Sequence, residues 1–417
     1  GGEFLQQNVG IVGQLGLPQA LQPQIVLPVE PLGAGVQPAD LVHRMDLREE
    51  CIFTIDSAES KDLDDAVSIQ RRGEGYRLGV HIADVSHYVR GNTPLDMEAL
   101  HRGTSVYYAD KVIPMLPKCL SNGICSLNPG EDRLAFSAIM DLDKEGQLRA
   151  YSFHKSVIRS RVKGVYKEIN TILAGTQTPE IAEKYAEVTE SLLLMNELAD
   201  KRLADRDRRG APSLDAPESK LILNEDGVCV DVQPRTRGRS ELLIEEFMLL
   251  ANESAARVAR EKSIPFVYRV HENPSPEKLE RLEEVLNRMN IPHPVLDEVR
   301  PCHFAQILKN AKGSPLLPAL NNLLLRSMAK AKYAPTPVGH FGLALADYTH
   351  FTSPIRRYPD LAIHRILSDV VLGYSKDWFD KRYAAFVQHA SERSSAAELR
   401  AMTAERDCED CYKAEYM

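Results

Sequence analysis

The feature that most constrains this chain is a run of closely spaced aspartates between two apolar segments. Residues 51–55 and 66–69 are mostly apolar and read as two strands, with a tight polar loop between them. Anchored strand ends would hold the carboxylates close together, and two like charges about 4 Å apart cost roughly 4 kcal/mol at an effective dielectric near 20. A hard divalent cation, bound by carboxylate oxygens, is the simplest way to offset that cost. The predicted metal ligands are Asp56, Asp62, Asp64 and Asp65.

Length and composition limit the class of protein. The chain has 417 residues and a net charge of −8, which argues against a non-specific nucleic-acid coat but allows a local basic channel. No apolar run is long enough to span a membrane, and the N-terminus lacks a signal core. The cysteines are scattered, so we expect a reducing, cytoplasmic setting. Cys408 and Cys411 form a lone CxxC, either incidental helix thiols or a zinc or redox motif.

The first 48 residues differ from the rest. They are rich in Gln, Pro and Gly, which predicts a linker that wraps on the core, and the first methionine is Met45, which suggests a piece of a longer protein. We predict a single domain over residues 49–417, with an α+β fold. Strands are expected near residues 51–55, 66–69, 77–82, 133–142, 219–233 and 264–270. Helices are expected over residues 179–206, 239–262, 276–290, 319–333, 359–372 and 375–413.

A second stretch whose residues could take part in binding or catalysis covers residues 350–360. Ser353 before Pro354 is typical of a helix start, and Pro359 indicates a second start. Backbone N–H groups, hydroxyls and the guanidinium groups of Arg356 and Arg357 could together bind a phosphate. The alternative is a capped helix whose arginines pair with nearby acids. The upstream carboxylates favour phosphoryl chemistry, because metal plus arginine is its usual equipment.

Two other groups of residues allow more than one interpretation. His81, Asp84 and His87 could form a metal cluster, but hydrogen bonds to the neighbouring loop at a strand end are favoured, because the four aspartates are better oxygen donors. Tyr107 and Tyr108 could stack on bases from a loop, or could be ordinary packing residues.

Seven ordered sequence blocks resemble the catalytic RNB domain of the ribonuclease II and ribonuclease R family, and the 350–360 block is more similar to the ribonuclease R branch. The resemblance covers about residues 45–417. The blocks lie at residues 54–67, 81–86, 102–107, 120–129, 244–252, 339–343 and 350–361. The resemblance implies an RNB fold, with a mixed β-sheet core that carries the metal loop and is surrounded by many α-helices.

The family resemblance also implies an activity. It predicts a processive, hydrolytic 3′-to-5′ exoribonuclease that degrades single-stranded RNA to 5′-nucleoside monophosphates. The expected cofactor is a pair of Mg²⁺ ions, with Mn²⁺ able to replace them, and the expected state is a monomer.

Individual roles follow by position from the same resemblance. Asp64 and Arg356 are expected to be catalytic: Asp64 helps hold the second metal or the attacking water, and Arg356 contacts the scissile phosphate. Tyr107 is expected to pack on a base near the 3′ end, while Tyr166 and Glu245 are expected to recognise the 2′-hydroxyl. The full set expected to contact RNA is Tyr107, Tyr166, Glu245, Ser353, Arg356 and Arg357.

The chain departs from the family pattern in several places. Leu214 stands where a phenylalanine usually completes the base clamp, so stacking there should be weaker. Lys163-Gly164-Val165 precedes Tyr166 where the family tends toward Arg-Leu-Thr, and the flanking OB-fold domains are not in this sequence.

The sequence leaves two alternative functions open. One is a non-catalytic RNB-like scaffold that binds RNA, whose mark would be loss of an aspartate. The other is a metal phosphodiesterase acting on DNA or short nucleotides, against which Tyr166 and Glu245 argue.

Overall fold

The computed structural model describes residues 35–214, 219–225 and 227–417. Its centre is a five-stranded sheet in the order β1-β8-β7-β4-β3, antiparallel except for the parallel β1–β8 pair. β4 lies between β3 and β7 and is buried along almost its whole length, as expected of a strand covered on both faces. The sheet strands are β1 Met45–Asp46, β3 Asp65–Arg72, β4 Gly75–Ala83, β7 Asp132–Leu142 and β8 Leu148–Arg159.

Shorter strand pairs lie around this sheet. The pair that matters most for the site is β2–β9, which is parallel and sets Asp56 opposite Val165. The pairs are β2 Thr54–Asp56 with β9 Lys163–Val165, β5 Val106–Tyr107 with β6 Val112–Ile113, β10 Ser219–Leu223 with β11 Cys229–Pro234, and β12 Tyr268–Val270 with β13 Lys332–Ala334.

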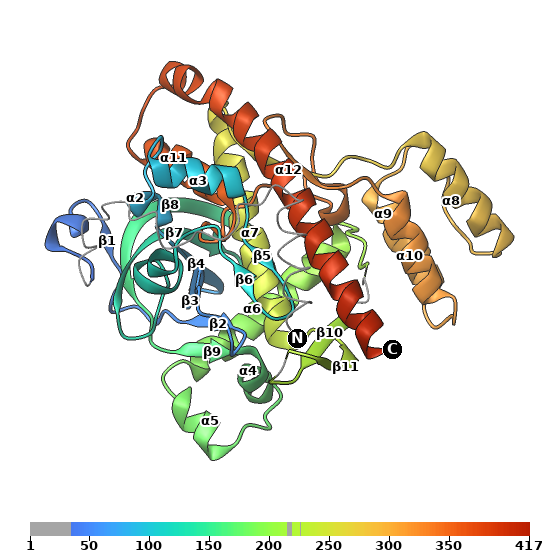
Figure 1. Cartoon of the computed structure of the whole chain (residues 1–417), viewed down its shortest axis with the longest axis horizontal. Coiled ribbons are helices and arrows are strands. Elements are labelled where there is room, and N and C mark those ends of the chain that lie inside the picture. Colours follow the sequence, from blue (N-terminus) through green and yellow to red (C-terminus); the bar gives the residue numbers. More distant parts are fainter. Residues whose placement is uncertain (1–34, 215–218, 226) are drawn as a thin grey trace.

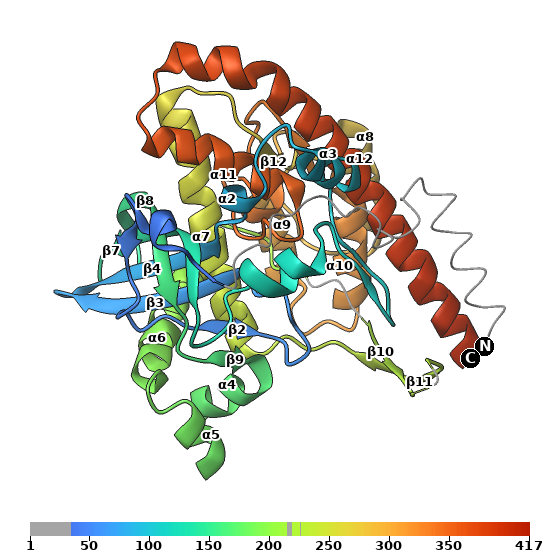
Figure 2. The ribbon, with the colours of Figure 1, turned by 60° about the vertical axis from the view of Figure 1, so that its left-hand side comes forward.

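Helices surround the sheet (Figures 1 and 2). They are α2 Val85–Tyr88, α3 Pro94–Arg102, α4 Tyr166–Leu173, α5 Pro179–Lys184, α6 Thr189–Arg208, α7 Arg239–Lys262, α8 Pro276–Arg288, α9 Pro301–Asn310, α10 Leu317–Ser327, α11 Tyr358–Val371 and α12 Lys376–Tyr416, with the short elements η1 Pro38–Leu41, η2 Cys119–Ile124 and η3 Phe341–Leu343. Buried residues of α6, α7 and α11 join the sheet in one large core. The predicted α+β class is therefore confirmed.

A second, smaller apolar cluster holds α8, α9 and α10 together. Its centre is Phe304, whose ring meets that of Phe341 edge to face at 5.2 Å between centroids. These three helices project from the body of the molecule in Figure 1. Leu214, the residue at the expected base-clamp position, is half-buried and packs against this cluster.

The 41-residue helix α12 crosses the molecule and contacts α3, β5, α11, β13 and the β10–β11 hairpin (Figure 2). Gly103 permits its close approach to α3. Gly103 has φ +71°, and a Cβ there would lie 2.4 Å from the Cβ of Ala397 on α12. A glycine is required at this crossing both by backbone conformation and by space.

Several predicted elements need correction. Residues 179–206 form two helices, α5 and α6, separated by a turn at residues 185–188 in which Tyr185 and Val188 are buried in the main core. The predicted helix over 319–333 ends at Ser327, and its last residues enter β13, which pairs with β12. Tertiary strand pairing overrides the helical pattern there. α3, α4 and α9 were not predicted.

The N-terminal segment is only partly described. Residues 1–34 of the predicted linker lie outside the described residues. Residues 35–48 contain η1 and β1, and Arg44 from this segment donates hydrogen bonds to the carbonyls of Ala135 and Ser156. The end of the segment is therefore attached to the main sheet, as a wrapping segment would be.

Candidate active site

The aspartate loop joins the end of β2 to the start of β3. Asp56 is the last residue of β2 and Asp65 the first of β3, so the two strands fix both ends of the loop. The Ser126 hydroxyl donates to the carbonyl of Lys61 at 2.9 Å and accepts from the N–H of Leu63 at 3.0 Å. The loop is therefore held from the side as well as from its ends.

Lys163, from β9, ties the other half of the loop. Its ammonium donates to the carbonyls of Ala58 and Ser60, at 2.9 and 2.6 Å. Its charge also acts on Asp56, where it favours the ionised carboxylate. Lys163 thus both positions the loop and partly offsets its negative charge.

Asp64 connects the loop to the distant 350–360 segment. Its side chain is 5% exposed, and one carboxylate oxygen accepts a 2.8 Å hydrogen bond from the backbone N–H of Ile355. The other oxygen lies 3.7 Å from Nε of Arg356. A buried carboxylate and a half-exposed guanidinium, 42% exposed, therefore meet at one point.

Three carboxyl groups of the loop, those of Asp56, Asp64 and Asp65, resist ionisation. Burial and the neighbouring charge of Asp65 raise the pKa of Asp56 to about 8. Burial raises the pKa of Asp65 to about 6, against the opposing charges of Arg356 and Arg357. Burial likewise raises the pKa of Asp64 well above its usual value. Strongly perturbed carboxyls gathered in one place are typical of functional sites.

The charge of these carboxyl groups suits a bound cation, and one of their buried oxygens lacks a hydrogen-bond partner. Oδ2 of Asp56 is buried without a hydrogen-bond partner, and such an atom is costly unless a ligand satisfies it. In residues 35–214, 219–225 and 227–417, no three His, Cys, Asp or Glu side chains are arranged as a complete metal cage. Mg²⁺ does not need one, because it usually takes one or two carboxylates together with water and substrate phosphates.

Buried hydrogen bonds hold the 350–360 segment rigid. Asn252 from α7 accepts from the N–H of Phe351 at 2.7 Å, and His364 from α11 bonds the carbonyl of the same residue at 2.7 Å. The N–H of Ser353 donates to Asp360 at 2.7 Å. The segment can therefore present Arg356 without first having to order itself.

The predicted helix start at Ser353-Pro354 is wrong. Residues 354–356 form a turn, Arg357 is extended and bridges to Thr104, and α11 begins at Tyr358 with Pro359 in its first turn. The bridge to Thr104 holds the backbone of Arg357 extended, so the helix begins only after this residue. The second predicted start, at Pro359, is confirmed.

The two arginines have different environments. Arg357 donates two hydrogen bonds to the fully buried Asp360, at 2.7 and 3.0 Å, so for this residue the alternative of an arginine paired with an acid is correct. Among the residues that the structure describes, Arg356 donates to the hydroxyl of Ser353, at 3.0 Å, and otherwise makes only a long contact with Asp64. Arg356 is therefore the guanidinium with free donors.

The expected RNA-contacting tyrosines lie near the same centre. Tyr107 is 39% exposed at the end of β5, and its hydroxyl lies within range of the charges of Arg356 and Asp62. Tyr166 begins α4, directly after the strand that pairs with β2, and its hydroxyl lies within range of Asp65 and Asp56. Burial raises the pKa of both phenols, so both are protonated donors at neutral pH.

Glu245 lies on α7 and is already paired. It accepts from Arg206 at 3.0 Å and from Arg237 at 3.3 Å. The glutamate whose charge acts on Tyr166 is instead Glu241, one turn earlier on the same helix. The structure thus does not place Tyr166 and Glu245 in direct contact.

The fold and site have clear relatives. The family model described as "RNB domain" matches residues 44–373.

The chain belongs to the RNB family.

Known RNB proteins match most of the chain. Ribonuclease R 1 of Lactococcus lactis is 43% identical over 380 residues, which is 91% of this chain and 46% of that protein. RNase R of Mycoplasma genitalium, solved in complex with ribose methylated single-stranded RNA, has a TM-score of 0.85 at 33% identity, covering 90% of this chain and 58% of that one. Yeast Ssd1, a pseudonuclease, shares the fold, with a TM-score of 0.73 at 20% identity over 89% of this chain and 45% of that one. The chain spans about half the length of the curated relatives it matches.

Sequence reasoning did not assign the RNB residues that support the site. Ser126, Asn252 and Asp360 lie inside the matching blocks but received no role. Lys163 was noted only as a departure from the family pattern. The available signal was chemical: a hydroxyl, an amide and a carboxyl in otherwise apolar buried segments need partners, and those partners are backbone groups of the site.

The His81, Asp84 and His87 group is not a metal cluster. Asp84 is paired with Arg44 and Lys155, at 2.7 and 2.6 Å. His81 is buried between two serine hydroxyls, and burial lowers its pKa to about 3. The alternative, in which these groups hydrogen-bond their neighbours, is correct.

The two CxxC thiols lie on different sides of helix α12. Cys408 is buried against Cys229 and Tyr412, whereas Cys411 is exposed on another side of α12. Cys408 therefore acts as a packing residue where α12 meets the β10–β11 hairpin. Within the described ranges, no helix combines the length and apolarity that crossing a bilayer requires.

Proposed function

We propose that this chain is a processive 3′-to-5′ exoribonuclease that hydrolyses single-stranded RNA to 5′-nucleoside monophosphates. One observation supports the proposal more strongly than the others. The buried Asp64 joins the carboxylate loop directly to the segment that carries Arg356. Carboxylates that can hold a divalent cation and a guanidinium that can bind phosphate are thereby fixed against each other, in a chain of the RNB family.

The carboxylates are proposed to hold the metal. Asp56, Asp62, Asp64 and Asp65 would hold two Mg²⁺ ions, which Mn²⁺ could replace, and the buried unsatisfied oxygen of Asp56 supports this role. Bound cations of this kind lower the pKa of coordinated water and stabilise both oxygens of an in-line displacement. Before a cation binds, protons on the high-pKa carboxyl groups of Asp56 and Asp65 limit the repulsion within the loop.

Arg356 is proposed to bind the scissile phosphate. Its guanidinium keeps most of its donors free and is half-exposed, so it can donate to the non-bridging oxygens as their charge increases. Ser353 accepts from the same guanidinium and orients it. Arg357 was also predicted to contact RNA. Its pairing with Asp360 supports a role in holding the segment instead.

Recognition of the RNA end is proposed to use Tyr107, Tyr166 and Glu245. Tyr107 offers an exposed ring on which a base can stack, worth about 1–3 kcal/mol. The protonated hydroxyl of Tyr166 can donate to a ribose 2′-hydroxyl. Glu245 could accept from the same hydroxyl only by releasing one of its arginines. Leu214 would leave the stacked base without an aromatic partner opposite Tyr107.

A product assay tests the proposal against its rivals. With Mg²⁺, single-stranded RNA labelled at the 5′ end should be converted to a short labelled end product without accumulation of intermediates. Uniformly labelled RNA should release mononucleotides, and EDTA should stop both reactions. DNA, and RNA with a 2′-deoxy 3′ terminus, should be degraded poorly. Binding without cleavage would support the scaffold alternative, and equal cleavage of DNA the phosphodiesterase alternative.

We further propose that the protein acts in the cytoplasm as a monomer. Unpaired cysteines throughout the described residues support a reducing compartment. Sedimentation at several concentrations would test the oligomeric state, and a concentration-dependent increase in mass would contradict it.

A further inference from the structure

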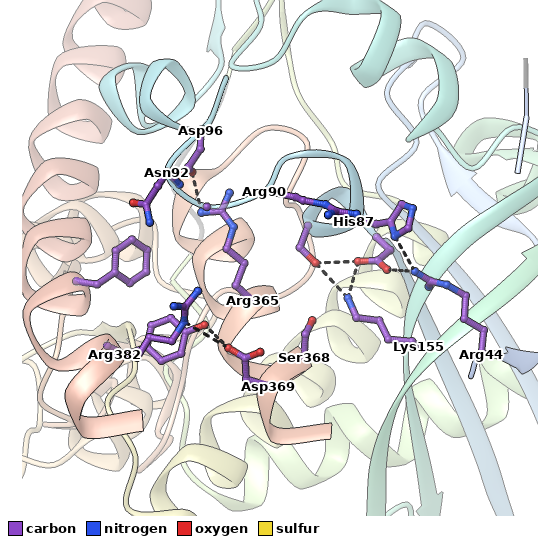
Figure 3. A pocket seen from close by; sticks show the side chains of 15 residues that line it. Arg44, His87, Arg90, Asn92, Asp96, Lys155, Arg365, Ser368, Asp369 and Arg382 are labelled. Atoms are coloured by element: carbon purple, nitrogen blue, oxygen red, sulfur yellow. Dashed lines mark hydrogen bonds and ion pairs between the residues drawn. The ribbon is translucent and has the colours of Figure 1, made fainter. Parts of the chain in front are cut away.

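A cavity of about 460 Å³ lies among α2, the end of α11, the start of α12 and β8. None of the four loop aspartates and neither Arg356 nor Tyr107 lines it. Figure 3 shows charged side chains on its two sides, with Arg44, His87 and Lys155 on one and Arg365, Asp369 and Arg382 on the other. Its size is within the range of cavities that bind small ligands.

The first side is a buried cluster with more cations than anions. Arg44 and Lys155 share one carboxylate, that of Asp84, whose side chain is fully buried. His87 stands beside them, and burial lowers the pKa of its ring, so it adds no charge at neutral pH. Asp40, behind His87, bonds its ring at 3.1 Å. A single buried carboxylate, that of Asp84, is therefore paired with two cations at the wall of the cavity.

The second side is only partly neutralised. Arg365 pairs with Asp96 at 2.7 Å, but its Nε is buried without a hydrogen-bond partner. Arg382 lies 3.9 Å from Asp369, whose carboxylate also accepts from the hydroxyl of Tyr383. Arg365 also donates to the carbonyl of Val89 at 2.7 Å and to the hydroxyl of Tyr358 at 3.2 Å, so it contributes mainly charge, whereas Arg382 makes only a long contact with its acid.

The charges that line the cavity do not balance. Five cations, Arg44, Arg90, Lys155, Arg365 and Arg382, face three carboxylates, Asp84, Asp96 and Asp369, which leaves a net charge of +2. Among the described residues, the Arg90 side chain has no hydrogen-bond or ion-pair partner. A dianion would balance this charge, and guanidinium groups match a phosphate geometrically.

Aromatic rings adjoin the same charges. Tyr383 and Phe386 line the cavity, and the guanidinium of Arg382 lies over the rings of Tyr383 and Trp378, at 5.5 and 5.3 Å from their centroids. Trp378 is in turn stacked on the half-exposed Tyr374. Flat apolar surface beside phosphate-binding groups suits a planar base attached to a phosphate.

We propose that this cavity binds a small phosphomonoester of the nucleoside 5′-monophosphate class. The phosphate dianion lies between Arg90 and Arg382, close to the charge of Arg365, and the base lies against Phe386. The inference does not rest on the proposed exoribonuclease activity, because it requires neither metal nor RNA.

Calorimetric titration of the whole chain in EDTA tests the proposal. We expect saturable binding of 5′-AMP, weaker binding of inorganic phosphate, and no binding of adenosine. Arg90→Ala with Arg382→Ala should weaken AMP binding about tenfold or more, because charge-assisted hydrogen bonds are lost. Both side chains are exposed, so the variant should fold, and circular dichroism and RNA hydrolysis without added phosphate should be unchanged.

Two further variants locate the site. Arg288→Ala removes an exposed arginine on α8, 81% exposed and outside the cavity, and should bind AMP as the wild type does. Arg356→Ala should also leave AMP binding unchanged. Absence of AMP binding by the wild type would overturn the proposal. Binding that Arg356→Ala abolishes while the Arg90 and Arg382 double variant does not would place the nucleotide at the candidate active site, and would overturn it as well.

Discussion

At the scale of single residues, a substitution at Asp64 can remove the negative charge while keeping the hydrogen bond from the N–H of Ile355. Asp64→Asn keeps an oxygen that can accept from the N–H of Ile355, so the 350–360 segment should stay in place. The negative charge is lost, and we expect turnover of RNA to fall by more than about 100-fold, the equivalent of several kcal/mol of transition-state stabilisation. Steady-state hydrolysis and RNA binding should be measured together. Normal turnover in this variant would refute the assignment of Asp64 to catalysis.

The two neighbouring arginines should behave differently when removed. Arg356→Ala removes the proposed donor to the scissile phosphate and should lower turnover by about 10²–10³-fold, with little change in stability because the side chain is half-exposed. A loss of RNA affinity without a loss of turnover would make Arg356 a positioning residue.

Arg357→Ala is the matched comparison. It leaves the carboxylate of Asp360, 0% exposed, without its charged partner and should cost about 3–5 kcal/mol of stability. Thermal unfolding of the two variants distinguishes them, and an Arg357→Ala protein as stable as the wild type would contradict this difference.

The carboxylate loop should make stability depend on pH. The pKa of Asp56 is 3.8 as a free side chain and about 8 in the fold, so the folded protein binds more protons between these values. Stability in EDTA should therefore fall as the pH rises through this window. Asp56→Asn should flatten the profile, and Mg²⁺ should raise the melting temperature of the wild type more than that of the variant. Melting curves across pH test this, and equal slopes for both proteins would contradict it.

At the scale of elements, the crossing of α3 and α12 positions two parts of the site. The carbonyl of Gly103 accepts from the N–H of Tyr358, next to Arg357, and Tyr107 follows four residues later with its N–H bonded to Glu405 of α12. A change in how α12 packs should therefore reach Tyr107 and Arg356 together.

Gly103→Ala tests this dependence. The new Cβ would meet that of Ala397 at 2.4 Å and would sit at φ +71°, so we expect a loss of about 1–3 kcal/mol of stability together with reduced RNA turnover. Gly373→Ala is a control with similar backbone strain, at φ +81°, but nothing within 4 Å. Its smaller loss, about 1 kcal/mol, should leave turnover unchanged. Similar melting temperatures for the two variants would show that α12 adjusts freely.

At the scale of the whole molecule, the two apolar clusters predict two regions that unfold separately. The large core joins the sheet to α6, α7 and α11, while the small cluster holds α8, α9 and α10. Phe304 is fully buried in the small cluster, so Phe304→Ala should cost about 3–5 kcal/mol within it. Hydrogen exchange should show that residues 276–327 open while the sheet stays protected.

Phe136→Ala in β7 is the corresponding change in the large core. Phe136 contacts Phe153, Phe351 and His364, so its removal should increase exchange throughout the sheet and around the 350–360 segment. If Phe304→Ala increased exchange equally in the sheet, the two clusters would be one cooperative unit.

Local sequence patterns are enough to predict the carboxylate loop and the long helices. Apolar runs on either side of Asp56 and Asp65 predicted a carboxylate loop anchored by strands, and helical periodicity predicted α7, α11 and α12 with nearly correct bounds. These features depend on residues a few positions apart, where side-chain period and backbone propensity act directly.

Which of the two adjacent arginines keeps free donors depends instead on packing between distant parts of the chain. The Asp64–Ile355 hydrogen bond joins residues 291 positions apart, and it fixes the turn that leaves Arg356 half-exposed while Arg357 pairs with Asp360. The cation-rich cavity likewise combines side chains from Arg44 to Phe386. Such contacts depend on how the whole chain packs, because their partners are neighbours in space and not in sequence. No local pattern encodes them.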